Sequence, residues 1–431
     1  MVGLSGWGIR FGGRGGVAVW RGVYARHRLD ISVGDISFGV VWCGLPWRRE
    51  KLEVEVLRQC SLEEEGLVCF SVRSGWDLWL GAQGLRAGDE VLVSAITHPD
   101  MVRIIQEHGL LAVPVDIDPM TLAPRPWMLE AALTPRTRVV LVAHIFGGRM
   151  HLGGVAKFAR ERGLLLVEDC AQAFQGLERI GDPAADVCMY SFGTIKTSTA
   201  LGGAVLRVRD KEVLGRMREV QASYPSQGRG VYLKKLLKVL GLVAVSRPRP
   251  YGLLGLACEQ LGYDIDALMG GVLRGFPLGE PAAMFFRHLR HRPSAPLLAM
   301  LCWRLRTFDG KRLARRAATG ERFARRLRMV DLHPGRHSLE KTHWLFPVIV
   351  ANPEALVADL MWHGLDASQA TSSIVAVGAP AGRSSPVEAS LMMSGMVFLP
   401  VYPELPSQAL DAMAWLVNDC AAHRVAERMA P

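Results

Sequence analysis

The stretch LLLVEDCAQAF, residues 164–174, and the stretch DVCMYSFGTIKTSTALGGAVLRV, residues 186–208, decide the fold of this chain. They contain three short apolar runs, 164–167, 186–192 and 203–208, with the length and the bounding residues of buried strands. The acid Asp169 directly follows the first run, and Lys196 lies in the turn before the third. Ionisable side chains are thus expected at the ends of buried strands.

An acid and a lysine in this order predict a site for pyridoxal phosphate (PLP). The lysine would hold the aldehyde of the cofactor as a Schiff base. The acid would face the pyridine nitrogen and keep it protonated, so that the ring draws electrons from a bound substrate. Taken singly, Asp169 could be a helix cap and Lys196 a solvated surface residue, because most surface charges have no specific role. Together they favour the cofactor site.

The motifs EDCAQA (168–173) and SFGTIK (191–196), followed by Gly-Gly, resemble the DegT/StrS-type sugar aminotransferases, a family of fold-type I PLP-dependent enzymes. The resemblance covers roughly residues 65–210, and more weakly the C-terminal end. It implies that Lys196 is the catalytic lysine, which also binds the cofactor. It further implies cofactor contacts for a set of polar residues, namely Asp169 with the ring nitrogen, Gln172 with the ring hydroxyl region or the substrate, and Ser191 with the phosphate.

Two further cofactor contacts depart from the family pattern. Ser74 and Gly75 stand where the family has a Ser-Gly-Thr phosphate-binding turn, but Trp76 replaces the threonine, which removes one hydroxyl. An ordinary serine-capped helix is the alternative there. His98 stands where the family has an aromatic residue that stacks on the pyridine ring. It could equally be a structural turn into the helix expected over 101–108.

Two residues are predicted near the substrate from the resemblance alone. His144 follows a strand expected over 138–143, and a capping or core histidine is the alternative. Arg292 matches an arginine in a loop that, in the family, comes near the active site of the neighbouring subunit. The arginines around it are typical of a solvated helix face. No metal site is predicted.

Strands and helices are expected to alternate through residues 91–167, which indicates an α/β fold with a mostly parallel sheet. The resemblance implies a large PLP-binding domain with a seven-stranded type of sheet flanked by helices, over 28–310, and a smaller C-terminal α+β domain over 311–431. A glycine- and arginine-rich flexible leader is expected over 1–27, and a helical, basic insertion over about 222–280. Residues 290–327 are predicted to be one long helical segment.

Bulk composition is that of a globular protein, with 431 residues, 49% hydrophobic and 21% charged. The net charge of +10 suits anionic partners, whether nucleic acid, phosphorylated or nucleotide-linked substrates, or an anionic membrane surface. The partner expected is an anionic small-molecule substrate, and no nucleic acid is expected. None of the eight cysteines forms a CxxC pair, so neither a zinc site nor a redox motif is indicated. No secretory signal and no long apolar run is visible, which predicts a cytoplasmic protein.

Lysines alternate with apolar residues near Lys234, Lys235 and Lys238. Such a basic amphipathic helix can lie on a membrane surface or bind an acidic partner, although an ordinary packed helix shows the same pattern. Peripheral membrane contact through 232–275 is therefore an expectation.

The sequence as a whole predicts a homodimeric aminotransferase. It would move an amino group from an amino acid, glutamate by expectation, to a nucleotide-linked keto-sugar in glycan or secondary-metabolite biosynthesis. Relatives in which histidine replaces the lysine are dehydratases, so Lys196 favours transamination. Two alternatives stay open: an aminotransferase for a lipid or polyketide-like carbonyl, and a non-catalytic regulatory or membrane-associated relative.

Overall fold

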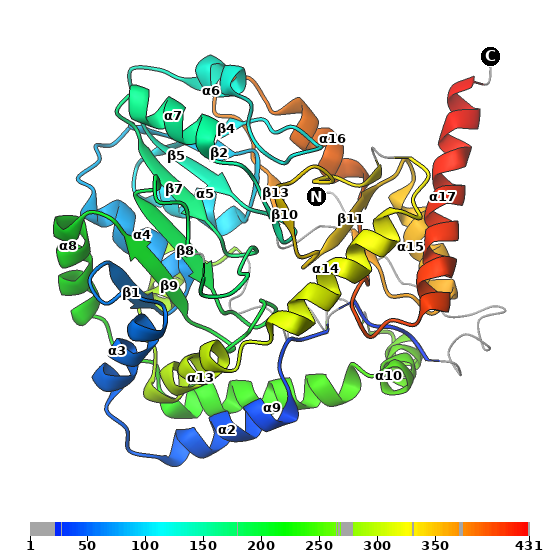
Figure 1. The fold of residues 1–431 in the computed structure, drawn as a ribbon, viewed down its shortest axis with the longest axis horizontal. Helices are drawn as coiled ribbons and strands as arrows, with labels where there is room; N and C mark the ends of the chain where they lie inside the picture. The colour runs from blue at the N-terminus through cyan, green and yellow to red at the C-terminus, as the bar shows by residue number, and fades with distance from the viewer. Residues whose placement is uncertain are drawn as a thin grey trace.

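The fold is built on a seven-stranded sheet in the order β1–β9–β8–β7–β5–β2–β4 (Figure 1). In this computed structural model the described residues are 22–429, except 27, 179, 264, 266, 267, 269–278, 330, 331 and 370–373. Neighbouring strands are parallel except at β9, which runs antiparallel to both β1 and β8. The strands are β1 Gly66–Cys69, β2 Glu90–Ser94, β4 Leu111–Val115, β5 Thr137–Ala143, β7 Leu165–Asp169, β8 Val187–Ser191 and β9 Ala204–Val208. The predicted α/β class with a mostly parallel sheet is confirmed.

Helices cover both faces of this sheet, because successive strand residues point to opposite sides and both sides are apolar. Leu166 packs into one hydrophobic cluster and Val167 into the other. The first cluster includes residues of α2 (Val33–Gly44), α3 (Arg49–Gln59), α6 (Pro126–Ala132), α7 (Gly153–Glu161), α9 (Arg229–Val245), α10 (Pro248–Gln260) and α13 (Ala295–Arg306). The second includes residues of α4 (Val72–Ala82), α5 (Pro99–Glu107), α8 (Lys211–Ala222) and α12 (Ala282–Leu289).

The C-terminal part forms a hydrophobic cluster of its own around a three-stranded antiparallel sheet in the order β11–β14–β12. Its elements are α14 (Gly310–Ala324), β11 (Phe346–Ile349), α15 (Pro353–Trp362), β12 (Ser368–Gln369), α16 (Val387–Gly395), β14 (Met396–Leu399) and α17 (Ser407–Met429). Two short ribbons join it to the rest: β3 (Ile96–Thr97) pairs with β13 (Val375–Ala376), and β6 (Gly148–Arg149) with β10 (Glu340–Lys341). The domain division at residue 310 stays a prediction.

Two sequence-based expectations need correction. The segment predicted as one helix over 290–327 is two helices, because the Asp309 side chain accepts the N–H of Arg312 and starts α14 afresh after α13 ends at Arg306. The leader predicted over 1–27 is ordered in its last part. Val23 is buried and Tyr24 forms a β-bridge with Leu365. Residues 1–21 and 27 lie outside the described residues, as do 264, 266, 267 and 269–278 of the basic insertion.

Across the described part of the chain, each helix is too short or too polar to cross a lipid bilayer.

Candidate active site

The turn between β8 and β9 carries Lys196 and is held firmly. The Lys196 N–H donates to the Gly193 carbonyl at 3.0 Å, and the Ile195 carbonyl accepts a hydrogen bond from the indole of Trp344 at 3.0 Å. The Trp344 ring lies 4.3 Å from the Lys196 Nζ, within cation–π distance. The C-terminal part of the chain therefore packs a tryptophan directly on the predicted catalytic amine.

Asp169 and Lys196 lie close enough to influence each other electrostatically. Asp169 is the last residue of β7, is buried, and accepts the Ala171 N–H at 2.9 Å. Burial raises the pKa of Asp169, and the positive charge of Lys196 partly opposes that rise. Burial lowers the pKa of Lys196 to about 8, which Asp169 opposes and Arg73 reinforces.

Arg73 belongs to the same group of charges and was missed by the sequence reasoning. It lies in the first turn of α4, and its Nη1 binds Asp100 at 2.6 Å. Its charge lowers the pKa of both Lys196 and His98. A cation in the first turn of a helix opposes the helix dipole. That unfavourable placement is the signal that could have singled it out.

The geometry does not support the predicted phosphate contacts of Ser74 and Gly75. Helix α4 begins at Val72 with Ser71 as its cap, so Ser74 and Gly75 lie inside its first turns rather than in a turn before it. The Ser74 N–H donates to Ser71 Oγ and the Gly75 N–H to the Ser71 carbonyl, each at 3.1 Å. The Ser74 hydroxyl donates to the Leu289 carbonyl at 2.7 Å. The alternative, a serine-capped helix, describes this turn, and both groups are already bonded.

Gly75 has a packing reason instead. A Cβ placed on it would lie 2.6 Å from Leu206 Cδ2, so the glycine lets α4 approach strand β9 closely. The backbone N–H groups of Val72 and Arg73 lie in the first turn of α4, at its N-terminal end. These two groups, together with the Arg73 guanidinium, are the anion-binding elements that the start of α4 offers.

His98 has the structural role that was the alternative to stacking on the cofactor ring, and it also lies near Lys196. Its Nδ1 accepts the N–H of Asp100 at 3.1 Å and caps α5, so it is a turn residue. It also lies close enough to Lys196 for the two charges to interact. Burial, with the charges of Arg73 and Lys196, lowers the pKa of His98 to about 4 although Asp100 opposes the shift. A neutral imidazole beside Lys196 is compatible with stacking, which stays a prediction.

Gln172 follows the end of β7, and Ser191 is the last residue of β8. The Gln172 Oε1 accepts the Phe146 N–H at 2.9 Å, where the backbone of Phe146 is left-handed with φ of 60°. The Ser191 Oγ accepts the Gly193 N–H at 3.4 Å. Both side chains are half-buried, so each fixes a loop of the site, and their predicted cofactor contacts stay predictions.

His144 is placed as a core residue, which was the alternative to a substrate contact. Its Nε2 donates to Glu168 at 2.8 Å and its Nδ1 accepts the Met150 N–H at 3.1 Å, and its side chain is fully buried. Cys170 lies close enough to complete a three-ligand metal cluster with this pair. Arg149, however, binds the same Glu168 at 3.2 Å, and its positive charge would oppose a metal cation there.

Arg292 holds a loop of its own chain. Its Nε donates to the Tyr224 carbonyl at 2.9 Å, and its backbone pairs with Ser226. The predicted contact with a neighbouring subunit stays a prediction.

The residues that surround Lys196 fit a PLP group at its ring end. A buried carboxylate with a raised pKa can share a proton with a pyridine nitrogen, and a buried lysine with a lowered pKa offers a neutral amine to an aldehyde. At the phosphate end the fit rests on Arg73 and the start of α4 rather than on Ser74 and Gly75.

Residues 49–238 match the model of the DegT/DnrJ/EryC1/StrS aminotransferase family, the family that the motifs of this segment resemble. Among curated relatives, a pleiotropic regulatory protein of Geobacillus stearothermophilus is 30% identical over 176 residues, which are 40% of this chain and 47% of that protein. L-glutamine:2-deoxy-scyllo-inosose aminotransferase of Streptomyces fradiae is 35% identical over 155 residues, 35% of this chain and 36% of that protein. The matched part thus spans half or less of these two relatives.

Solved structures of aminotransferases share the fold over nearly the whole chain. TlmJ of Streptoalloteichus hindustanus superposes with a TM-score of 0.65 at 20% identity, covering 94% of this chain and 100% of its own. PseC of Helicobacter pylori, an aminotransferase of pseudaminic acid biosynthesis, gives 0.66 at 13% identity, covering 93% and 100%. At these identities the likeness establishes the fold.

Proposed function

We propose that this protein is a PLP-dependent aminotransferase that transfers an amino group from an amino acid, glutamate by expectation, to a nucleotide-linked keto-sugar. The observation that carries the proposal is the electrostatic interaction between the buried Asp169, at the end of β7, and the half-buried Lys196, in the turn after β8, inside the segment that matches the family model. Two relatives are named as aminotransferases, which supports the reaction class; one of these names specifies a dTDP-linked sugar, and a third relative is named GDP-perosamine synthase.

When bound, PLP would supply an electron sink for the carbon that gains or loses the amino group. Lys196 would hold the group, and its amine would move a proton to and from the substrate carbon. A pKa of about 8 suits that role, because the amine is then able both to accept and to release a proton near neutral pH. Asp169 would hold the proton at the ring nitrogen, and Trp344 would orient the lysine and keep water from it.

The phosphate end of the cofactor would lie at the start of α4. Arg73 offers a guanidinium there, beside the backbone N–H groups of the first turn of α4, and such an arrangement suits phosphate. Asp100, which pairs with Arg73 at 2.6 Å, would keep that guanidinium in place.

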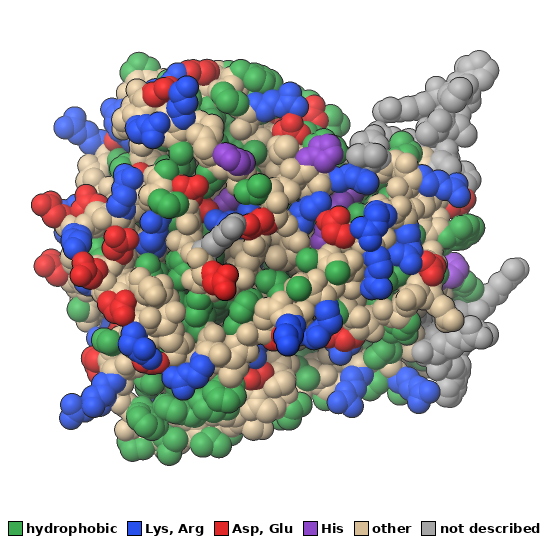
Figure 2. Space-filling view, in the orientation of Figure 1, with side chains coloured by type: hydrophobic (Ala, Val, Ile, Leu, Met, Phe, Trp, Pro, Cys, Tyr) green, Lys and Arg blue, Asp and Glu red, His purple; other side chains and the backbone are tan. Residues whose placement is uncertain are grey.

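A second candidate, a lipid-like acceptor or a regulatory role at a membrane, rests on the surface formed by α2 and α9. Exposed apolar side chains gather along the lower edge of the molecule, where these helices lie (Figure 2). Val41 and Leu237 are more than half exposed, and Lys234 and Lys238 are exposed beside them. One of the relatives is named as a regulatory protein.

A homodimer is part of the proposal, and light scattering of the purified protein would test it.

The deciding experiment is an absorbance spectrum of the purified protein with PLP, before and after glutamate. Wild type should bind PLP covalently, and glutamate should convert the visible band to the shorter-wavelength pyridoxamine form. Lys196→Ala should lack the band, whereas Lys157→Ala, on the exposed face of α7, should behave as wild type. If wild type shows no band, the aminotransferase proposal fails and the membrane or regulatory candidate takes its place.

A further inference from the structure

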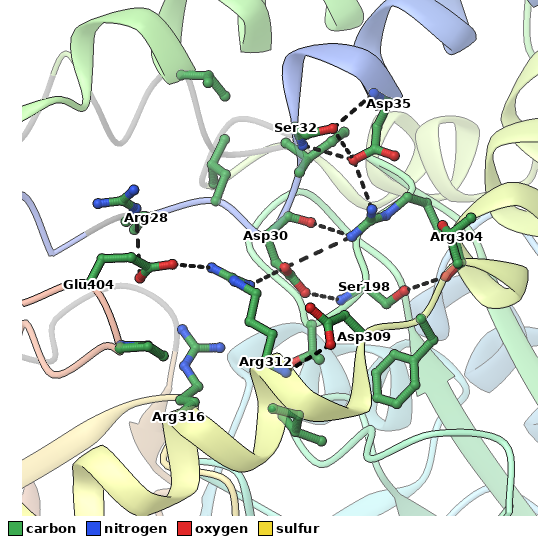
Figure 3. Close-up of a pocket in the computed structure, with 18 of the residues that line it drawn as sticks. Arg28, Asp30, Ser32, Asp35, Ser198, Arg304, Asp309, Arg312, Arg316 and Glu404 are labelled. Atoms are coloured by element: carbon green, nitrogen blue, oxygen red, sulfur yellow. Dashed lines mark hydrogen bonds and ion pairs between the residues drawn. The ribbon is translucent and has the colours of Figure 1, made fainter.

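A cavity of about 430 Å³ lies behind the Lys196 turn, apart from the site described above. It is enclosed by residues 28–33, the C-terminal ends of α9 and α13, the start of α14, and Pro403 and Glu404 (Figure 3). Thr197 and Ser198 line it, but Lys196, Asp169, Arg73 and His98 do not. Its volume falls in the range of small-molecule sites.

Charged side chains crowd this cavity, and its acids already have partners. Asp35 binds Arg304 at 2.8 Å and also accepts from the indole of Trp303 at 2.8 Å. Asp30 accepts the Ser198 N–H at 2.6 Å and pairs with Arg312.

The other two acids are engaged as well. Glu404 pairs with Arg312 at 3.5 Å and with Arg28 at 3.9 Å. Asp309 caps α14. The five arginines that line the cavity, 28, 247, 304, 312 and 316, therefore face four acids that are all in use.

Arg316 and the exposed Arg247 are the two arginines of this cavity for which the described residues provide no ion pair, and Arg316 is the less exposed of them. It lies one helical turn after Arg312 on α14, so the two like charges share a helix face, which is unfavourable. Among the described residues, no carboxylate lies within ion-pair distance of it, and its Nε is buried without a hydrogen-bond partner. Burial and the charge of Arg312 lower the pKa of Arg316 to about 10, although the charges of Asp30 and Glu404 oppose the shift. Arg316 as a whole is half-buried, and a buried Nε without a hydrogen-bond partner is costly unless a ligand pairs with it.

We propose that this cavity binds a small organic oxyanion, a carboxylate or a phosphate ester, with Arg316 as its principal contact. The planar guanidinium fork suits both groups, because each offers two oxygens in matching geometry. Arg28 and Arg247 add positive charge at the same cavity. Because these arginines are not among the residues around Lys196, ligand binding in the cavity can be tested independently of transamination.

The test is isothermal titration calorimetry of the full-length protein, pre-loaded with PLP so that the cofactor site does not compete. Inorganic phosphate and succinate are the two probes, at constant ionic strength. Saturable binding of either probe is expected in wild type, with affinity at least tenfold lower in Arg316→Gln; the probe that binds identifies the class of ligand. The matched control is Arg315→Gln, on the exposed side of the same turn, which should bind as wild type.

Thermal unfolding gives a second, independent readout. Without a probe, Arg316→Gln should melt no lower than wild type, because it removes a charge that has no partner. A saturating probe should raise the melting temperature of wild type and of Arg315→Gln, but not of Arg316→Gln. Should the glutamine variant fail to fold, Arg316→Lys keeps the charge, loses the fork and should bind several-fold more weakly. Binding that is equal in wild type and the Arg316 variants, or absent for both probes, would overturn the site.

Discussion

At the scale of single residues, the Lys196 amine loses its proton more easily than an exposed lysine does. Burial and the charge of Arg73 favour the neutral amine, while Asp169 opposes them, and the balance lowers its pKa to about 8. The neutral amine is the form that adds to an aldehyde. Covalent capture of PLP by the cofactor-free protein should therefore speed up as pH rises and level off above about 8, rather than near the ~10.4 of an ordinary lysine.

Stopped-flow absorbance across the pH range measures this midpoint. Asp169→Asn removes the carboxylate that favours the charged amine, so its midpoint should fall below that of wild type. Glu130→Gln, a carboxylate removed from the distant helix α6, should leave the midpoint unchanged. A wild-type midpoint near that of a free lysine would show that the amine is not in the buried environment described here.

At the scale of elements, α14 packs closely against His343, just before strand β11, and the absence of a side chain at Gly320 allows this contact. A Cβ on Gly320 would lie 2.2 Å from His343 Cδ2, and the His343 ring is held by Glu321 at 3.0 Å. Gly320→Ala should therefore lower the free energy of unfolding by about 1–3 kcal/mol, the usual cost of overpacking. Chemical denaturation measures the change.

Gly215 supplies the opposite case. It lies inside α8, and a Cβ there would have no atom within 4 Å. Gly215→Ala should raise the free energy of unfolding by about 0.5–1 kcal/mol, because alanine is the better helix former. If both substitutions changed the free energy of unfolding by the same amount and in the same direction, the close contact between α14 and His343 would not be the cause of the expected loss.

At the scale of the whole molecule, the apolar surface of α2 and α9 with its exposed lysines favours an anionic membrane surface. Apolar area and positive charge act together in such binding. Wild type should co-sediment with vesicles that contain anionic lipid, and less so as salt rises. The double substitution Lys234→Gln and Lys238→Gln should reduce the bound fraction severalfold.

The matched control removes the same charge elsewhere. Lys51 on α3 and Lys157 on α7 are exposed lysines outside this surface, and their double glutamine variant should bind as wild type. If binding were equally weak for vesicles of neutral and anionic lipid, the membrane would be excluded as the partner of this surface. The second subunit of the expected dimer would then be the favoured partner.

The sequence determined the sheet and the chemistry at its edge. Short apolar runs bounded by turns predict strands such as β7, β8 and β9 from local pattern alone, and that placed Asp169 and Lys196 near each other before any contact was known. The break between α13 and α14 could have been found in the same way, from the Asp309 cap.

Only the tertiary structure decided what each side chain near Lys196 contacts. Ser71 rather than Ser74 caps α4, Trp344 contacts Lys196 from the C-terminal part, and the Arg316 Nε finds no hydrogen-bond partner among the described residues. The physical reason is that strand formation follows from neighbours along the chain, whereas desolvation and ion pairing depend on groups far apart in sequence. The turn that carries Lys196 could therefore be predicted from the sequence, whereas the residues that surround Lys196 and shift its pKa could not.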